Sequence, residues 1–231
     1  ILPLDEIVAP RIFKNDNWNF FIIKFIKKNI KNKNNFFFDI GANVGLITKQ
    51  LQNLNLNINS YFCFEPEVNN FKILKKNLKN KNTFFYNYGL ASKNKKTKLF
   101  VNNLNKSDNS IYLNNYKETK DRLNKIDLKD SNTVLNKIIK ENNINHIIYK
   151  SDTQGMDEEI FLNLNDSIIE KIYLLILEIS NFDFITKNLD KLLNKLKKFK
   201  SISTEKETNI SIDHLKILIV KKEEFNLLVK K

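Results

Sequence analysis

The chain has 231 residues and a formal net charge of +13 at pH 7. Its length suffices for one α/β domain with a full core but not for two of ordinary size, so we expect a single domain over residues 1–231, with an N-terminal helical segment at 1–34 and the core at 35–231. A single cysteine, Cys63, excludes an intrachain disulfide, and no apolar run approaches the ~18–20 residues that span a bilayer. With no secretory signal visible in the first residues, these features predict a cytoplasmic protein.

Apolar strands alternate with amphipathic helices along the chain, which predicts a Rossmann-like α/β fold. We expect a mostly parallel seven-stranded sheet with helices on both faces and a C-terminal antiparallel hairpin. Strands are expected at residues 36–40, 61–65, 83–88, 144–151, 172–179, 199–204 and 214–220. Helices are expected at residues 17–30, 44–54, 67–78, 132–141, 184–198 and, as a short one, from 157. Between 97 and 130 the pattern is weak, and only 98–101 and 110–113 are candidate short strands.

The first expected helix carries an apolar stripe of Trp18, Phe21, Ile22, Phe25 and Ile26, with lysines beside it. Such a stripe can enter a membrane interface when basic residues flank it. More often it packs on the edge of a sheet. We favour packing.

The first strand ends in an acid and continues into a glycine-rich turn, Asp39-Ile-Gly-Ala-Asn-Val-Gly45. Gly41 and Gly45 would let the backbone approach a ligand where a Cβ would collide, and the next helix directs free N–H groups into the crevice beyond the strand ends. The loop differs from the dinucleotide fingerprint, because its glycines are four residues apart and Ala42 and Asn43 fill the gap. Asp39 would repel a pyrophosphate but suits a ligand that carries an ammonium group.

Glu65 ends the second strand, twenty residues after Gly45. At this position of a Rossmann-like fold an acid can accept hydrogen bonds from both hydroxyls of a ribose. The alternative is an exposed acid that caps the next helix; we favour the ribose contact. The third strand brings residues 87–91, with Gly89, to the same edge, where an adenine would lie.

The fourth strand leads into Lys150-Ser-Asp-Thr-Gln-Gly-Met-Asp157, which would bring Asp152, Gln154 and Asp157 to the same rim, near Glu178 at the end of the fifth strand. Carboxylates in a cleft can serve as a general base for a hydroxyl or hold a hard divalent cation. The alternative for both aspartates is helix capping. We favour a catalytic role for Asp152, give the two readings of Asp157 equal weight, and assign no metal ligands.

These motifs, in this order over residues 36–180, resemble those of the FkbM-type methyltransferase family. The matching segments are residues 39–45, 64–66, 70–78, 150–157 and 177–179. Two mild departures are Ser151, where the family has an aliphatic residue, and Asp157, where it has glutamate.

The resemblance implies a class I methyltransferase fold, S-adenosylmethionine (SAM) as cofactor, and methylation of an oxygen on a sugar, glycan or other small molecule. In such a reaction Asp152 would deprotonate or orient the acceptor hydroxyl, with catalysis resting mainly on proximity and orientation. We assign the cofactor to Asp39, Gly41, Asn43, Gly45, Glu65 and Gly89. We assign catalysis to Asp152, Gln154 and Asp157.

The positive charge leaves other functions open, namely an RNA or protein methyltransferase that uses the basic surface, or a non-catalytic interaction module. Only Arg11 and Arg122 of the 39 basic residues are arginine, the side chain best suited to phosphates and base edges. The lysines are dispersed, and abundant Lys, Asn, Ile and Phe are typical of an A/T-rich coding sequence. We therefore do not favour nucleic acid as partner, and a module without activity would be expected to have lost Asp39, Gly41 or Glu65.

Overall fold

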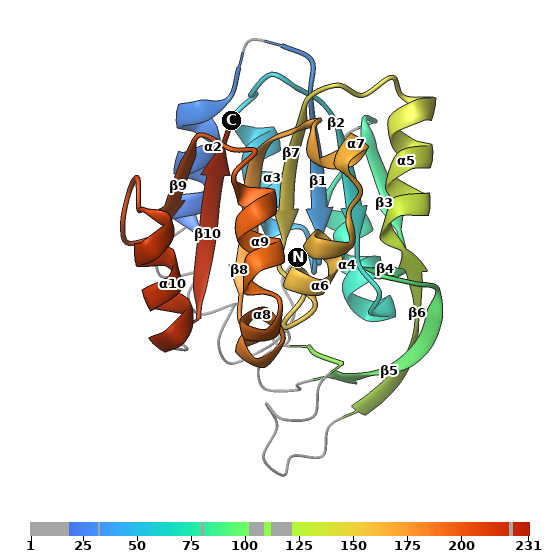
Figure 1. Ribbon diagram of the computed structural model, residues 1–231. Coiled ribbons are helices and arrows are strands. Elements are labelled where there is room, and N and C mark those ends of the chain that lie inside the picture. The colour runs from blue at the N-terminus through green and yellow to red at the C-terminus, as the bar shows by residue number, and fades with distance from the viewer. Residues whose placement is uncertain (1–18, 32, 80, 102–108, 112–121, 222–223) are drawn as a thin grey trace.

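The computed structural model describes residues 19–31, 33–79, 81–101, 109–111, 122–221 and 224–231 (Figure 1). The strands are β1 Asn35–Ile40, β2 Ile58–Phe64, β3 Thr83–Tyr86, β4 Gly89–Ala91, β5 Lys95–Val101, β6 Arg122–Asp130, β7 Ile147–Ser151, β8 Ile172–Ile179, β9 Ser201–Thr204 and β10 Phe225–Lys230. The helices are α2 Phe20–Asn29, α3 Leu46–Asn53, α4 Val68–Asn77, α5 Ser131–Glu141, α6 Asp157–Asn163, α7 Asp166–Ile169, α8 Phe182–Lys187, α9 Leu189–Leu196 and α10 Ile212–Lys221. Within these ranges, no helix has the length and apolarity that crossing a bilayer requires.

The central sheet confirms the predicted fold class. Its seven strands lie in the order β3-β2-β1-β7-β8-β10-β9. Strands β3, β2, β1, β7 and β8 pair in parallel, whereas β10 is antiparallel to both β8 and β9. The strand order reverses between β1 and β7, and open α/β sheets bind their ligands at such a switch point, beyond the carboxyl ends of the strands.

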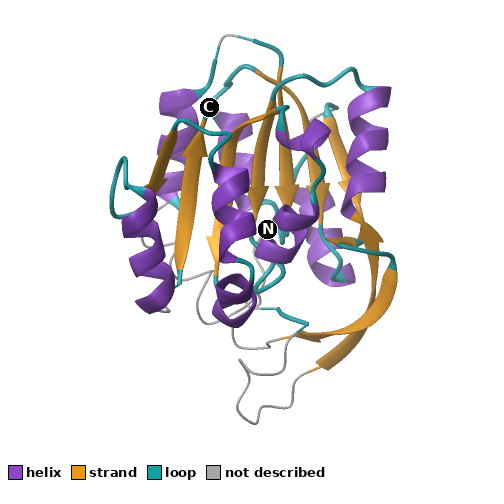
Figure 2. Cartoon of the chain, in the orientation of Figure 1, coloured by secondary structure: helices purple, strands orange, loops and turns teal. Residues whose placement is uncertain are grey.

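Helices cover both faces of this sheet (Figure 2). Buried side chains of α2, α3 and α4 share one apolar cluster with Phe37 and Cys63. Buried side chains of α5 to α10 share the other cluster with Phe38 and Phe62. Neighbouring residues of β1 and β2 thus face opposite layers, as the two-residue period of a strand requires, while all residues of the central strand β8 are buried.

A second, three-stranded sheet, β4-β6-β5, extends beyond the carboxyl ends of β1 and β2 (Figure 1). The sequence prediction missed β4 and β6 and started β5 too late. In β6 the alternation of a strand is visible in retrospect, because Ile126 and Leu128 are buried while Lys125 and Asp127, which alternate with them, are exposed. Of the second candidate strand, Ser110 forms an isolated bridge to Phe100, and 112–113 lie outside the described residues.

The predicted strand at 214–220 is wrong, because these residues belong to helix α10. Leu215 and Ile219, four residues apart, are buried against the sheet layer, while Ile217 and Val220 are 53% and 74% exposed. This spacing is helical, and a short apolar run does not distinguish helix from strand by itself. The second strand of the predicted C-terminal pair is β10, which follows α10 and pairs with β9.

The predicted helix at 184–198 is interrupted at Asn188, between α8 and α9. The side-chain amide of Asn188 donates to the carbonyl of Phe184 at 2.9 Å. Asparagine competes in this way for backbone carbonyls and so favours a helix end over a helix interior.

The apolar stripe of the first helix packs on the sheet, as favoured. In α2, Ile22, Ile23 and Ile26 are buried, and Phe21 and Phe25 pack against the same cluster. Trp18 lies outside the described residues. The stripe therefore contributes to the core of the protein.

Candidate active site

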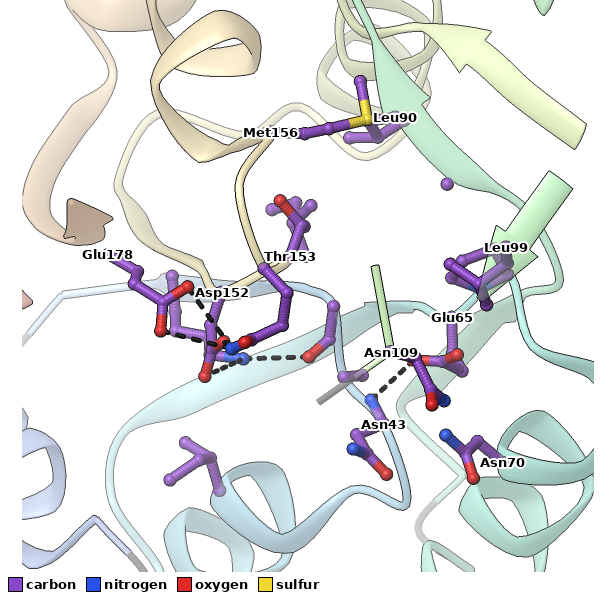
Figure 3. A pocket seen from close by; sticks show the side chains of 18 of the residues that line it. Asn43, Glu65, Asn70, Leu90, Leu99, Asn109, Asp152, Thr153, Met156 and Glu178 are labelled. Atoms are coloured by element: carbon purple, nitrogen blue, oxygen red, sulfur yellow. Dashed lines mark hydrogen bonds and ion pairs between the residues drawn. The ribbon is translucent and has the colours of Figure 1, made fainter. Parts of the chain in front are cut away.

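A cavity of about 470 Å³ lies at the carboxyl ends of β1, β2 and β7, between the central sheet and the three-stranded sheet (Figure 3). Its volume falls in the range of ~300–1,000 Å³ that is usual for small-molecule sites. The predicted site residues that line it are Gly41, Asn43, Glu65, Gly89, Asp152 and Gln154. The predicted residues Asp39, Gly45 and Asp157 are not part of its lining.

The glycine loop between β1 and α3 lines the cavity on one side and packs closely against the rest of the chain on the other. Gly41 has a φ of +74°, and a Cβ there would lie 2.0 Å from the backbone oxygen of Asp152. Its N–H donates to the carbonyl of Phe64 at 3.0 Å. At Gly45 a Cβ would lie 2.7 Å from the Leu74 side chain. The close neighbours of both positions are parts of the chain itself, so packing alone excludes a side chain there, and the prediction that these glycines let the backbone approach a ligand stays a prediction.

Glu65 anchors the loop from the end of β2. One carboxylate oxygen accepts from the N–H of Asn43 at 2.9 Å and the other from the N–H of Glu67 at 2.8 Å. Burial raises the pKa of Glu65 to about 7, although these two backbone donors lower it. The N-cap of α4 is Glu67, so Glu65 does not cap that helix. Each of its oxygens can accept a further hydrogen bond from a group in the cavity.

One half of the cavity is apolar. Its wall carries large side chains from the three-stranded sheet and the loop before α6, namely Leu90, Leu99, Ile126, Leu128 and Met156; Figure 3 shows Leu90, Leu99 and Met156 at the margin of the site. A flat apolar group such as a nucleobase would be buried well there.

Gly89 lines this half, and a Cβ there would lie 2.5 Å from Cδ2 of Leu128. The prediction placed all of 87–91 at an adenine site. Asn87 instead donates to the carbonyls of Glu65 and Pro66, and it lines a neighbouring groove.

Asp39 lies beneath the loop and faces a cation of the protein. Its carboxylate forms an ion pair with Lys150 at 3.0 Å and accepts from the Thr48 hydroxyl at 2.7 Å. Both members of the pair are buried. Burial by itself lowers the pKa of Lys150, but the carboxylates of Asp39 and Asp152 outweigh this effect and raise the pKa above its ordinary value.

Lys150 connects the two loops of the site. Besides Asp39, its ammonium group donates to the carbonyl of Gly41 at 3.0 Å and lies 3.8 Å from the Asp152 carboxylate. One buried cation thus connects the glycine loop after β1 to the acidic loop after β7.

The acidic half of the cavity contains Asp152, Gln154 and Glu178. The side-chain amide of Gln154 donates to Asp152 at 3.0 Å and to the two oxygens of Glu178 at 3.3 and 3.4 Å (Figure 3). Gln154 has a φ of +57°, in the left-handed region that is costly for a residue with a side chain. Burial raises the pKa of Glu178 well above its ordinary value, and the charges of Asp152, Asp157 and Glu224 raise it further.

Asp157 does not line the cavity, but its hydrogen bonds fix the conformation of the loop after β7. It is fully buried and accepts from the Ser151 hydroxyl and from the N–H of Thr153 at 2.9 and 3.0 Å. Burial and the charge of Asp152 raise its pKa to about 6. Since its bonds go to the preceding loop, Asp157 neither caps α6 nor reaches the cavity.

The sequence placed Glu178 near the rim without assigning it to the site, and it gave no role to Lys150, Glu224 or Asn226; all four line the cavity. For Lys150 and Glu178 the signal was their position at the ends of strands that meet at the switch point. Glu224 and Asn226 come from the start of β10, which the sequence analysis had not predicted. No group of three His, Cys, Asp or Glu side chains in the described part of the chain is placed to hold a metal ion.

Comparison with solved structures finds a similar fold at low sequence identity. The structure of methyltransferase FkbM from Methylobacillus flagellatus matches with a TM-score of 0.55 and 13% identity, over 90% of this chain and 47% of that chain. The chain has the fold of that methyltransferase. It spans about half the length of the FkbM protein, and the FkbM resemblance expected from the motifs holds at the level of the fold.

Two other structures match more weakly. Precorrin-6y C5,15-methyltransferase from Geobacter metallireducens has a TM-score of 0.42 at 13% identity, over 91% of this chain and 87% of that one. A protein provisionally described as an RNA methyltransferase, from Pyrococcus horikoshii, has a TM-score of 0.40 at 10% identity, over 91% and 79%. No protein-family profile and no curated protein sequence matches the chain.

Proposed function

We propose that the protein is a SAM-dependent methyltransferase that methylates a hydroxyl group of a sugar, glycan or small molecule. The observation that carries the proposal is the cavity at the β1–β7 switch point, with Glu65 and an apolar wall on one side and Asp152 on the other. The two sides suit the two parts of the reaction, a nucleoside cofactor and a polar acceptor.

The residues present fit SAM. Glu65 has acceptor capacity for the two ribose hydroxyls, and the wall that includes Leu90, Ile126 and Leu128 suits the adenine ring. The neighbouring carboxylate-rich half suits the sulfonium charge, which S-adenosylhomocysteine lacks. When bound, the cofactor would supply a sulfonium methyl group, whose bond to sulfur breaks as the acceptor oxygen bonds to the methyl carbon, with S-adenosylhomocysteine as the leaving group.

In this proposal the chain itself contributes position and a proton acceptor. Asp152 would accept the proton of the acceptor hydroxyl, Gln154 would orient the Asp152 carboxylate through its 3.0 Å hydrogen bond, and Lys150 would hold the same loop from below. Holding a hydroxyl in line and removing its proton are the two effects that general-base catalysis of this kind needs.

We expect Glu65→Ala to weaken binding of S-adenosylhomocysteine by ~1–3 kcal/mol, because hydrogen bonds to a charged acceptor would be lost. Isothermal titration calorimetry of the wild type should show one site with micromolar affinity. Glu141→Gln, on the exposed surface of α5, serves as the control and should bind as the wild type does. Absence of any binding heat or thermal shift in the wild type would contradict the cofactor assignment, and binding of NADH instead would indicate a dehydrogenase.

We expect Gln154→Gly to change the free energy of unfolding by less than ~1 kcal/mol, because relief of the left-handed strain offsets the larger entropy of the unfolded chain. Methyl transfer should nevertheless fall by about tenfold or more, since the amide that orients Asp152 is lost. Asn55→Gly makes the same backbone change at an exposed turn with a φ of +48° and should leave transfer unchanged. Urea unfolding and turnover of both variants test this, and full activity in the Gln154 variant would contradict the role.

Transfer of tritiated methyl groups from SAM to extracts fractionated into glycan, RNA, protein and small-molecule pools tests the acceptor class. We expect label in the glycan or small-molecule pool. A specific observation favours the RNA alternative, namely a groove beside the cavity that is lined by Lys96, Lys98 and Lys125. Label confined to the RNA pool would select that alternative, and a non-catalytic module would label no pool although S-adenosylhomocysteine binds.

A further inference from the structure

The acidic half of the cavity contrasts with the charge of the whole protein. Three carboxylates line it, those of Asp152, Glu178 and Glu224, in a chain whose net charge is +13. Among the described lining residues Lys150 is the one cation, and its ammonium group is engaged by Asp39 and by the carbonyl of Gly41, each at 3.0 Å, and lies 3.8 Å from the Asp152 carboxylate. It forms no ion pair with Glu178.

Glu178 is the buried carboxylate of this half that has no cation of the described chain as its partner. Its side chain lines the cavity although the residue is only 5% exposed. Its hydrogen bonds come from one neutral amide, that of Gln154, at 3.3 and 3.4 Å, and no described residue forms an ion pair with it. A buried carboxylate without a cation is costly, so a ligand that brings a positive charge to Glu178 would be favoured there.

The cofactor alone does not balance this charge. SAM carries an ammonium and a sulfonium group against one carboxylate, which leaves it one net positive charge. With Asp39 paired to Lys150, the one net positive charge of SAM balances Asp152 alone. Burial raises the pKa of Glu178 well above its ordinary value, so the charged form of Glu178 needs a second cation beside it. A divalent metal is not favoured as the balancing ion, because the described residues offer no group of three ligands placed to hold one.

We propose that the acceptor carries a protonated amino group near the hydroxyl that is methylated, as an amino sugar does, and that Glu178 recognises this ammonium group. Asp152 then remains available to accept the proton of the hydroxyl. The Gln154 amide holds the carboxylates of Asp152 and Glu178 in place through its hydrogen bonds. The neutral amide of Asn226, which also lines the cavity, is suited to a further hydroxyl of such a molecule. This inference rests on the proposed function, because it names the acceptor of the same site.

The test uses three pyranoses that differ in charge: glucosamine, glucose and glucuronate. Each is titrated by calorimetry into the protein saturated with S-adenosylhomocysteine. We expect glucosamine to bind about tenfold more tightly than glucose, the effect of one charge-assisted hydrogen bond, and glucuronate to bind most weakly. The advantage of glucosamine should shrink as the salt concentration rises.

Glu178→Gln should reduce the affinity for glucosamine to that for glucose and leave the affinity for S-adenosylhomocysteine unchanged. Glu141→Gln, at an exposed position on α5, is the matched control and should keep the preference. If S-adenosylhomocysteine binds but glucosamine shows no advantage over glucose, or if the Glu178 variant keeps the advantage, the inference is overturned while the proposed function stands. If S-adenosylhomocysteine does not bind, the proposed function itself fails.

Discussion

Asp152→Asn is expected to lower kcat by ~10²–10⁴, the usual contribution of a positioned general base. The substitution keeps the size of the side chain and an oxygen that can still accept from Gln154, so the geometry of the loop should survive. What it removes is the negative charge that would take the acceptor proton. Because Asp152 lies opposite Glu65 across the cavity (Figure 3), the affinity for S-adenosylhomocysteine should change little.

The first readout is slow background methyl transfer to water or to a simple sugar, measured together with urea unfolding. Asp127→Asn, on the exposed face of β6, controls for the loss of a surface carboxylate and should keep wild-type turnover. Wild-type turnover in the Asp152 variant at unchanged KM would end the general-base assignment. Activity that vanishes with a chelator and returns with Mg²⁺ would show that Asp152 holds a metal instead.

Lys150→Met is expected to reduce the free energy of unfolding by ~3–5 kcal/mol, the cost of leaving a buried charge without its partner. Lys150 and Asp39 are cross-strand neighbours in the register of β7 and β1, and the Asp39 carboxylate is fully buried. Methionine keeps most of the apolar stem, so the loss should come from the uncompensated carboxylate and from the released carbonyl of Gly41.

The double variant Asp39→Asn/Lys150→Met distinguishes the cost of an unpaired buried charge from the cost of altered packing. It removes both charges, so it should be more stable than Lys150→Met alone, and the two substitutions should be strongly non-additive. Urea unfolding of the wild type, both single variants and the double variant gives the coupling energy. Additive losses would mean that the Asp39–Lys150 contact contributes no specific interaction.

The central sheet was predictable because its strands are continuous apolar runs. The run at β8 is buried along its whole length, and its predicted bounds match those observed. The three-stranded sheet was harder, since β6 alternates Lys125, Ile126 and Asp127 in a segment rich in asparagine and lysine. Helix α10 was misread because the apolar period of a seven-residue window is ambiguous.

The candidate site was predictable where it depends on residues at strand ends. Glu65 and Asp152 line one cavity because parallel strands meet at one edge. The pairing of Asp39 with Lys150 depends on the register between strands more than a hundred residues apart, which the sequence does not encode locally. Glu224 reaches the cavity through the antiparallel strand β10, whose place in the sheet is likewise set by long-range pairing.

The glycines of this protein are informative because there are so few. The chain has only four, Gly41, Gly45, Gly89 and Gly155, and all of them belong to the walls or loops of one cavity. In the described chain asparagine also holds left-handed turns, both at the cavity and away from it, at φ values between 48° and 53° for Asn19, Asn43, Asn55, Asn143 and Asn209. Among residues with a side chain, asparagine is one of the few that adopt such turns routinely.

Asparagine does not fit where glycine persists. At Gly41 any side chain would collide with the Asp152 backbone, and Gly155 has a φ of +110°, far from the angles that the asparagines adopt. Glycine thus stands where a side chain would collide or where the backbone needs a φ that these asparagines do not adopt, and these places lie around the cavity. In other chains with as few glycines, we expect the positions of those glycines to indicate the functional site before any motif is recognised.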